Sequence, residues 1–142
     1  MNYYSFNKTT LWLNIVGALV SYVLFAVELY TSAAQHTSYT SSLVFIFLAV
    51  NCTFRIFSWY RINRKKKSGL SEEALAKEER RQGMIDSIFS NATGVLVMLA
   101  LTVHFIIRNT PVAFIVFCAV CTLCFVGILV LSIQNLKRIE RQ

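Results

Sequence analysis

The sequence predicts an all-α polytopic membrane protein: four transmembrane helices form two tandem hairpins packed in a bundle, with both termini cytoplasmic. Three observations carry this prediction. Hydrophobic residues make up 56% of the 142 residues, charged residues make up only 15%, and the basic residues gather on one side of the apolar segments. A typical soluble domain has about a quarter charged residues. This chain therefore lacks the charge to build a water-facing surface, and we expect a single membrane domain.

Four apolar segments are each close to the roughly 20 residues that a helix needs to cross about 30 Å of hydrocarbon. They are predicted at residues 11–33, 42–60, 86–107 and 111–133. The first two form one hairpin, residues 11–60, and the last two form another, residues 86–133. Trp12 and Tyr30 bracket the first segment, and Trp59 and Tyr60 end the second, as expected of the aromatic belt at a membrane interface.

The basic residues give these segments a direction. Of the fourteen Lys and Arg residues, eight lie between the second and third segments and three follow the fourth, whereas residues 34–41 contain none. Cytoplasmic loops carry the excess of Lys and Arg in membrane proteins. The loop 61–85, the tail 134–142 and the N-terminus are therefore predicted to be cytoplasmic. The net charge of +7 is therefore first a topology signal.

The loop 61–85 joins a basic cluster to a segment of mixed charge. Ser71 followed by Glu72 and Glu73 predicts the start of a short helix, which we expect to continue into the third span through Gly83. The basic side chains either anchor the topology and attract anionic lipid headgroups, or form a docking surface for a protein. Nucleic acid is not expected as a partner, because no aromatic interleaving or known motif accompanies them. The candidate contact residues are Arg64, Lys65, Lys66, Lys67, Lys77, Arg80 and Arg81.

The two hairpins resemble each other in sequence. A shift of 77 residues aligns them without a gap and gives nine identities, among them Asn14 with Asn91 and Gly17 with Gly94. Apolar segments also resemble each other by composition alone, so both a duplication and a chance likeness stay open. A duplication would relate the hairpins by an axis along the membrane normal.

The central loop leads through Glu79-Arg80 and Ile85 into a small-residue helix start at Ala92 and Gly94. With four spans in two hairpins, this pattern resembles the small uncharacterised four-helix integral membrane proteins of Gram-positive bacteria. The resemblance covers the whole chain in architecture. It implies a four-span fold with no assigned enzymatic activity, and it assigns no site residue.

Ionisable groups inside the outer half of the membrane are the first functional candidates, because burying them in hydrocarbon is costly. Glu28 and His104 lie at nearly the same depth, with Gln35 and His36 in the loop above them. We interpret Glu28 and His104 as a structural hydrogen-bonded pair near the interface. A proton or cation site is one alternative, because histidine titrates near neutrality. A metal site that includes His36 is another, although no fixed ligand spacing supports it.

A second polar layer is predicted in the inner half of the membrane. Arg55 lies near the depths of Asn14 and Asn91, whose amides would satisfy its charge, unless it extends to the phosphates or binds an anionic substrate. Asp86 begins the third span, where a helix N-terminal acid is favourable, and is expected to pair with Arg55 or the basic loop.

Enzyme chemistry has little support in this sequence. Cys118, Cys121 and Cys124 have the spacing of a metal or redox pattern, but they lie among apolar residues without a completing ligand and are interpreted as packing residues. No nucleophile with a base, paired carboxylates at one depth, Gly-rich phosphate loop or metalloprotease motif is present. We expect no catalytic residue, no cofactor and no metal.

Two hypotheses for function follow. The first is a non-enzymatic membrane protein that acts through partner binding, as an accessory or regulatory subunit or an immunity-type protein. The alternative is a small homodimeric transporter or channel with a Glu/His proton or cation site. The partner is expected to be another membrane protein or a second copy of the chain. Convergence of Glu28, Arg55 and His104 on one aqueous cavity would favour transport, whereas separate partners would favour binding.

Overall fold

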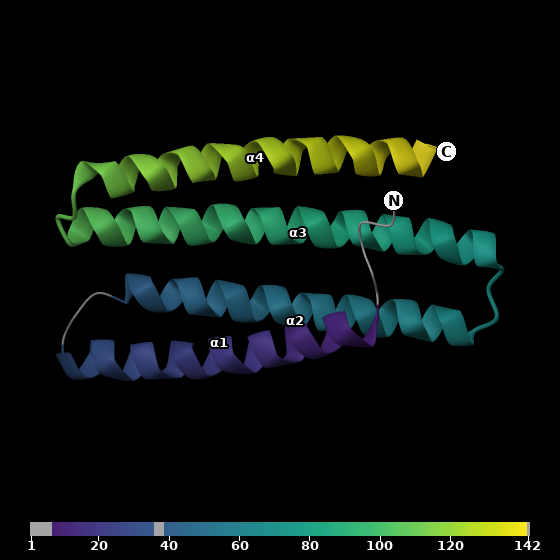
Figure 1. Ribbon diagram of the computed structural model, residues 1–142, viewed down its shortest axis with the longest axis horizontal. Helices are drawn as coiled ribbons and strands as arrows, with labels where there is room; N and C mark the ends of the chain where they lie inside the picture. The colour runs from purple at the N-terminus through teal and green to yellow at the C-terminus, as the bar shows by residue number, and fades with distance from the viewer. Residues whose placement is uncertain (1–6, 36–38, 142) are drawn as a thin grey trace.

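The computed structural model describes residues 7–35 and 39–141, which form four helices (Figure 1). The helices are α1 (Lys8–Gln35), α2 (Thr40–Lys67), α3 (Glu72–Ile107) and α4 (Val112–Arg141). Each is long and apolar enough to cross a membrane. This confirms the predicted all-helical fold with four membrane-length helices, and it indicates an integral membrane protein.

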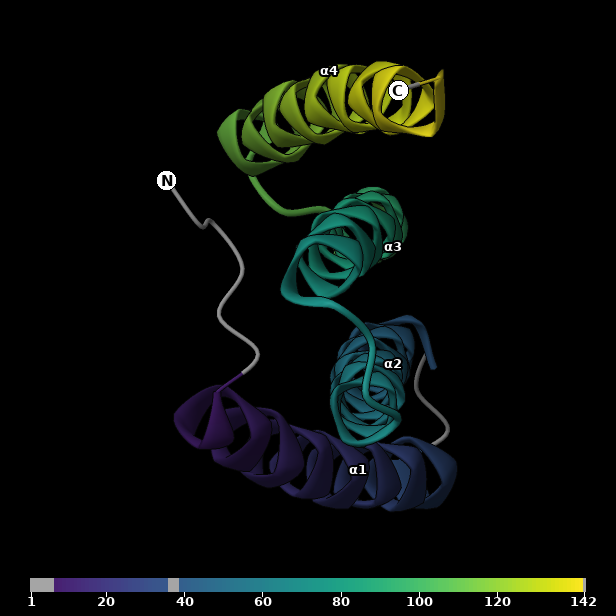
Figure 2. The ribbon, with the colours of Figure 1, turned by 90° about the vertical axis from the view of Figure 1, so that its right-hand side faces the viewer.

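The helices pack in chain order as an open row. Helix α1 packs on α2, α2 on α3, and α3 on α4, and no other pair of helices is in contact within the described residues. Seen end on, α1 and α4 lie at opposite ends of the row (Figure 2). Helices α1 and α2 are in contact, as are α3 and α4, but the two pairs lie side by side instead of closing around a common core. An open row is compatible with a membrane because lipid can cover the apolar outer faces of α1 and α4.

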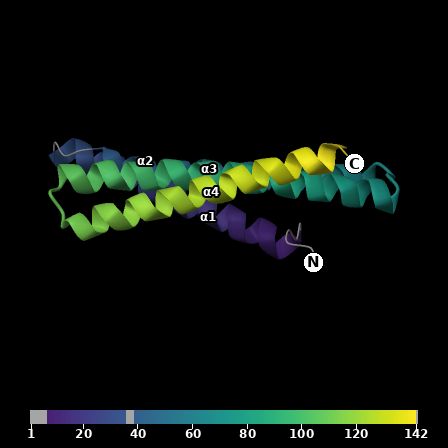
Figure 3. The ribbon, with the colours of Figure 1, turned by 90° about the horizontal axis from the view of Figure 1, so that it is seen from above.

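Neighbouring helices run in opposite directions, so α1 and α3 share one direction and α2 and α4 share the other (Figure 1). The start of α1, the α2–α3 connection and the end of α4 all lie at the same end of the structure along the helix axes (Figure 3). Twelve of the fourteen basic residues belong to these segments. The remaining two are Arg55, within α2, and Arg108, at the opposite end.

The helix ends follow local sequence signals. Asn7 caps α1, since the backbone N–H of Thr10 donates to Asn7 Oδ1 over 2.8 Å. Ser71 caps α3 by accepting from the N–H of Ala74 at 3.4 Å. The helix predicted to start near Ser71 is thus confirmed, and it runs without interruption through Gly83 into the third span. Asn109, with φ of 50°, closes the tight turn before α4.

The helices meet through small and polar residues, while large apolar side chains face outwards. Of the fourteen residues that are buried in the described part of the chain, eight are polar, and Ala49 and Ser58 are completely buried. Leu123 on α4 is 72% exposed, and Tyr30 on α1 is 77% exposed. Small residues let helix backbones approach closely, and lipid takes the place of a hydrophobic core on the outside. This distribution is the one expected of membrane helices.

Candidate functional site

The ionisable and polar side chains gather mainly at the α2/α3 interface, in the middle of the row. Along α2, Asn51, Arg55 and Ser58 follow each other at spacings of four and three, which places them on one face of the helix. Gln82, Asp86 and Ser90 repeat this at spacings of four on α3. Hydrogen bonds join the two sets and extend the interface to its outer end, and the residues that make them are Thr40, Asn51, Arg55, Ser58, Gln82, Asp86, Ser90 and His104.

Ser58, Gln82 and Asp86 form a closed hydrogen-bonded triad at the inner end of the interface. Ser58 Oγ donates to Asp86 Oδ1 over 2.6 Å. Gln82 Nε2 donates both to Ser58 Oγ at 2.9 Å and to Asp86 Oδ1 at 3.1 Å. Ser58 is fully buried and Asp86 is 6% exposed. A carboxyl group so far from water needs such donors, because burying it without partners costs several kcal/mol.

The triad corrects the prediction for Asp86. Because α3 begins at Glu72, Asp86 lies in the interior of the helix and not at its N-terminus. Its hydrogen-bond donors are Ser58 and Gln82, and no ion pair between Asp86 and Arg55 is present in the described part of the chain. Ser58 from α2 and Gln82 from the preceding turn of α3 take the place of the expected basic partner.

Arg55 also bonds across the α2/α3 interface. Its Nε and Nη2 donate to Ser90 Oγ over 3.2 and 3.1 Å, and Ser90 Oγ in turn donates to Asn51 Oδ1 over 3.0 Å. Two N–H groups of the guanidinium thus donate to one hydroxyl, which in turn donates a hydrogen bond to an amide oxygen. The charge of Arg55 is held by neutral polar groups, without an acid in direct contact.

The predicted partners of Arg55 are placed elsewhere. Asn14 Nδ2 donates to the carbonyl oxygen of Thr10, and Asn91 Nδ2 donates to the carbonyl oxygen of Ser87, each over 2.7 Å and within one helix. Both amides therefore satisfy their own helix backbone four residues earlier, a pattern common for short polar side chains. Similar depth in the membrane did not bring them to Arg55, because Asn14 and Asn91 each bond within their own helix.

Glu28 and His104 each bond to the first turn of α2 and not to each other. Ser41 Oγ donates to Glu28 Oε2 over 3.2 Å, and the Thr40 hydroxyl lies 3.0 Å from His104 Nδ1. Helix α2 stands between α1 and α3, so the predicted Glu28–His104 pair is replaced by two separate contacts with neighbouring hydroxyls.

The metal alternative finds no support in the described residues. His36, its third member, lies outside them, and Gln35 is exposed at the end of α1. No group of three His, Cys, Asp or Glu side chains suited to a metal ion occurs in residues 7–35 and 39–141. Cys118 is buried, Cys121 half-buried and Cys124 exposed, so the three thiols do not face one site.

The α2/α3 interface keeps one antiparallel register over its whole length. From Thr40–His104 to Arg55–Ser90 and on to Lys65–Glu78, each step back along α3 matches a nearly equal step forward along α2. The stacked rings of Phe54 and Phe89, with centroids 4.0 Å apart, fit the same register. The two helices therefore continue side by side past the predicted end of the membrane, and residues 61–81 form a basic hairpin.

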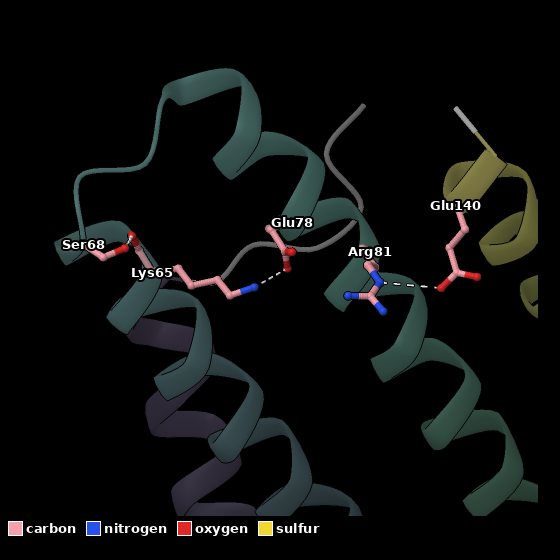
Figure 4. Close-up of polar contacts among 5 residues, drawn as sticks. All are labelled: Lys65, Ser68, Glu78, Arg81 and Glu140. Atoms are coloured by element: carbon pink, nitrogen blue, oxygen red, sulfur yellow. Dashed lines mark hydrogen bonds and ion pairs between the residues drawn. The ribbon is translucent and has the colours of Figure 1, made fainter.

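Two ion pairs join α2 to α3 in this basic hairpin. Lys65 Nζ lies 2.7 Å from Glu78 Oε2, and Lys66 Nζ lies 2.8 Å from Glu79 Oε1. Figure 4 shows the first of these pairs, together with a longer contact of 3.6 Å between Arg81 Nε and Glu140 Oε1 that ties α3 to α4. The hydrogen bond from Lys65 holds the pKa of Glu78 below its usual range, although partial burial of the carboxylate opposes the shift.

The candidate contact residues of the loop fall into two groups. Lys65, Lys66 and Arg81 are engaged with glutamates. The others are exposed and have no ion pair within the described residues: Arg64, Lys67, Lys77 and Arg80. The ion pairs therefore leave a positive surface without ion pairs on the basic hairpin.

Two surface cavities lie next to the basic hairpin. The first, of about 690 Å³, lies along one face of α2 from Phe57 to Ser68. The second, of about 620 Å³, lies between the start of α3 and the end of α4, where its lining includes Glu73, Lys77 and Ile139. Along the helix axes, both cavities lie at the end of the structure that is rich in basic residues.

The sequence prediction missed the α2/α3 triad, although a signal was available. Ser58, Gln82 and Ser90 are ordinary polar residues in a composition count, and depth alone did not single them out. The helical spacing of polar residues in two consecutive segments would have indicated that both carry a polar face, and two such faces are best placed against each other.

Comparisons of the chain with protein-family models, curated proteins and solved structures find no match. The resemblance to small membrane proteins of Gram-positive bacteria accordingly stays a prediction.

Proposed function

We propose that this protein is a small non-enzymatic membrane protein that acts by binding a partner, as an accessory or regulatory subunit or an immunity-type protein. We further propose a bacterial plasma membrane, with both termini in the cytoplasm. One observation carries the proposal: Glu28, Arg55 and His104 are satisfied by separate neighbours, namely Ser41, Ser90 and Thr40. Ionisable groups held in this way act as contacts between helices and not as a shared path for a substrate.

The proposed partner surface is the groove between α3 and α4 at the cytoplasmic end. Lys77 and Arg80 line this groove and have no ion pair in the described residues, while Ala76 and Ile139 supply apolar lining. The Arg81–Glu140 contact holds the two helices together beside it. A positively charged groove with apolar lining suits an acidic amphipathic segment of another membrane protein, since charge complementarity favours association.

A crosslinking experiment in native membranes tests this proposal. A photoreactive amino acid at Ala76 should capture one protein of defined mass, while the same residue at Asn109, on the opposite turn, should not. The capture should persist in Glu28→Gln and disappear in Lys77→Glu/Arg80→Glu. Capture that survives the double charge reversal would contradict the proposal, and capture of a second copy of the chain would identify the partner as a homo-oligomer.

The alternative function, a homodimeric transporter or channel with a proton or cation site, is favoured by one observation. Ionisable side chains occur along the α2/α3 interface from Asp86 and Arg55 at one end to His104 at the other. Proton- or ion-coupled flux in proteoliposomes that is lost in Glu28→Gln would support this alternative and overturn partner binding as the main activity. Flux unchanged by Glu28→Gln and by His104→Gln would remove the proposed Glu/His site.

A further inference from the structure

The first cytoplasmic cavity combines apolar and basic walls on one face of α2. Its lining follows the spacing of a single helix face: Phe57, Tyr60, Arg61, Arg64, Lys65 and Ser68. Phe57 and Tyr60 are 66% and 61% exposed, so both rings are open to the surroundings of the helix. The aromatic residues lie at the predicted membrane boundary and the basic residues lie beyond it. The cavity therefore spans the interface between hydrocarbon and water.

The charges at this cavity are unbalanced. Arg61, Arg64, Lys65 and Lys67 line it, and no acidic residue of the described chain does. Lys65 is neutralised by Glu78 from α3, which leaves three positive charges without an ion pair. The groove between α3 and α4 differs, because Glu73 lies there beside Lys77 and Arg80. Of the two cavities, the one on α2 is the stronger attractor for an anion.

We propose that this face of α2 is a binding site for an anionic phospholipid. Arg61 and Arg64 hold the phosphate of the headgroup, and the acyl chains lie against Phe57 and Tyr60. Arginine suits this role because its guanidinium binds phosphate oxygens in a bidentate manner and is weakly hydrated. Amphipathic aromatic rings at the headgroup level complete a site in which each part of the lipid meets matching chemistry. The site is separate from the α3/α4 groove proposed for the partner.

Trp59 does not line the cavity but lies beside Tyr60, which does, and it can therefore serve as a nearby fluorescent probe. Its ring contacts that of Tyr60 edge on, with centroids 5.4 Å apart. The chain contains two tryptophans, so Trp12→Phe leaves Trp59 as the single fluorophore. In this background the protein is reconstituted into phosphatidylcholine vesicles containing a minor fraction of brominated phosphatidylglycerol. Bromine quenches tryptophan on contact, and brominated phosphatidylcholine at the same fraction measures the nonspecific background.

The proposal expects stronger quenching by the brominated anionic lipid than by the zwitterionic one. Each arginine removed should lower this preference about fivefold, the effect of one basic residue near an anionic surface. Arg61→Gln/Arg64→Gln should therefore lose most of the preference, and Arg61→Lys/Arg64→Lys should keep part of it because the charge remains. Lys77→Gln/Arg80→Gln, which removes equal charge from α3, should leave it unchanged.

Three outcomes would overturn the proposal: equal quenching by the two lipids, an equal loss in the α3 control variant, or a full preference in Arg61→Gln/Arg64→Gln. Inorganic phosphate distinguishes the two sources of the ligand chemistry. Release of the lipid by phosphate beyond that caused by sodium chloride of equal ionic strength would assign the site to a free phosphate compound instead. Circular dichroism of each variant confirms that its helices are retained before the quenching is compared.

Discussion

The interface between the hairpins and the interfaces within them are built differently. Within the hairpins, glycines allow close packing: a Cβ on Gly17 would lie 3.1 Å from Cys52 Sγ, and one on Gly94 would lie 2.8 Å from the ring of Phe125. Between the hairpins, α2 and α3 meet through the Ser58–Gln82–Asp86 triad and the Arg55–Ser90 bond. Close packing with single hydroxyl contacts, such as Tyr22–Thr53, thus joins the helices of each pair, whereas a buried hydrogen-bonded network joins the two pairs.

This difference teaches where specificity resides. Two apolar helices with small residues pack against each other over a range of rotations, whereas a buried carboxyl group accepts only an arrangement that satisfies it. We infer that the α2/α3 hydrogen bonds set the order and register of the row. The four predictions below test this division between packing and hydrogen bonding.

Breaking the triad should have the largest effect. Ser58→Val replaces the hydroxyl by apolar methyl groups, which removes the donor to Asp86 and the acceptor for Gln82, both buried. Leaving such groups unsatisfied should lower the free energy of unfolding by about 3 kcal/mol. The measurement is unfolding in mixed micelles with increasing dodecyl sulfate, followed by circular dichroism.

A compensated variant provides the control for the triad. In Ser58→Val/Gln82→Leu/Asp86→Leu all three partners are apolar, so most of the lost stability should return even though the hydrogen bonds do not. A loss in Ser58→Val below about 0.5 kcal/mol, the size of an ordinary surface substitution, would show that the α2/α3 interface does not depend on these bonds.

The second prediction concerns packing within the second hairpin. Gly94→Ala places a Cβ against the ring of Phe125 and should destabilise the protein by about 1 to 2 kcal/mol, as overpacking does in a well-packed contact. Gly127→Ala is the matched control, because nothing lies within 4 Å of its built Cβ. This control should be neutral or slightly stabilising, since alanine favours a helix over glycine. Equal losses in the two variants would mean that helix propensity, and not the α3/α4 contact, determines the cost.

The four helices were predictable because length and apolar composition determine whether a segment can cross a membrane. The start of α3 at Ser71 was also predictable, since the cap and the two following glutamates are local signals. The open row was not predictable, because both lipid and neighbouring helices accept apolar surfaces. The sequence of a hydrophobic segment therefore does not determine which of its faces packs against another helix.

The partners of the polar residues were harder to predict for a related reason. Depth along the membrane normal follows from residue number, but partnership also depends on rotation about the helix axis and on which helices are neighbours. Glu28 and His104 share a depth, yet α2 separates the helices that carry them. Arg55 and Asn91 are near in depth, but Ser90, one residue earlier, faces the arginine. The spacing of the polar residues on α2 and α3 did indicate this rotation, because it shows which face of each helix is polar.

The third prediction tests a hydrogen bond within the first hairpin. The hydroxyls of Tyr22 and Thr53 lie 3.2 Å apart, and Thr53 Oγ1 also donates to the carbonyl oxygen of Ala49 over 2.8 Å. Tyr22→Phe should therefore cost about 0.6 kcal/mol, the usual value for one bond between membrane helices. Thr53→Val is the companion variant and should cost no more. If Tyr22→Phe costs as much as Ser58→Val in the same unfolding assay, the distinction between the two kinds of interface fails.

The smallest effect is expected where the α2/α3 register continues into water. Lys65 and Glu78 repeat the pairing of the triad one step further along the helices, but their side chains are 30% and 27% exposed. Solvent screens such a pair, so Glu78→Gln should change stability by only about 0.2 to 1 kcal/mol. Arg80→Gln, at an exposed position of α3 without an ion pair in the described residues, is the matched control and should change it less.

The pH dependence of this pair gives a sharper test than its stability. The pKa of Glu78 is lowered in the folded protein, chiefly by the Lys65 hydrogen bond. Its contribution is therefore present above the unfolded pKa and is lost as pH falls through the lower, folded value. NMR titration should find the Glu78 pKa below the ordinary value for a glutamate, and Lys65→Gln should return it towards that value. A Glu78 pKa that does not respond to Lys65→Gln would mean that the helices separate beyond the membrane and that the register ends at the triad.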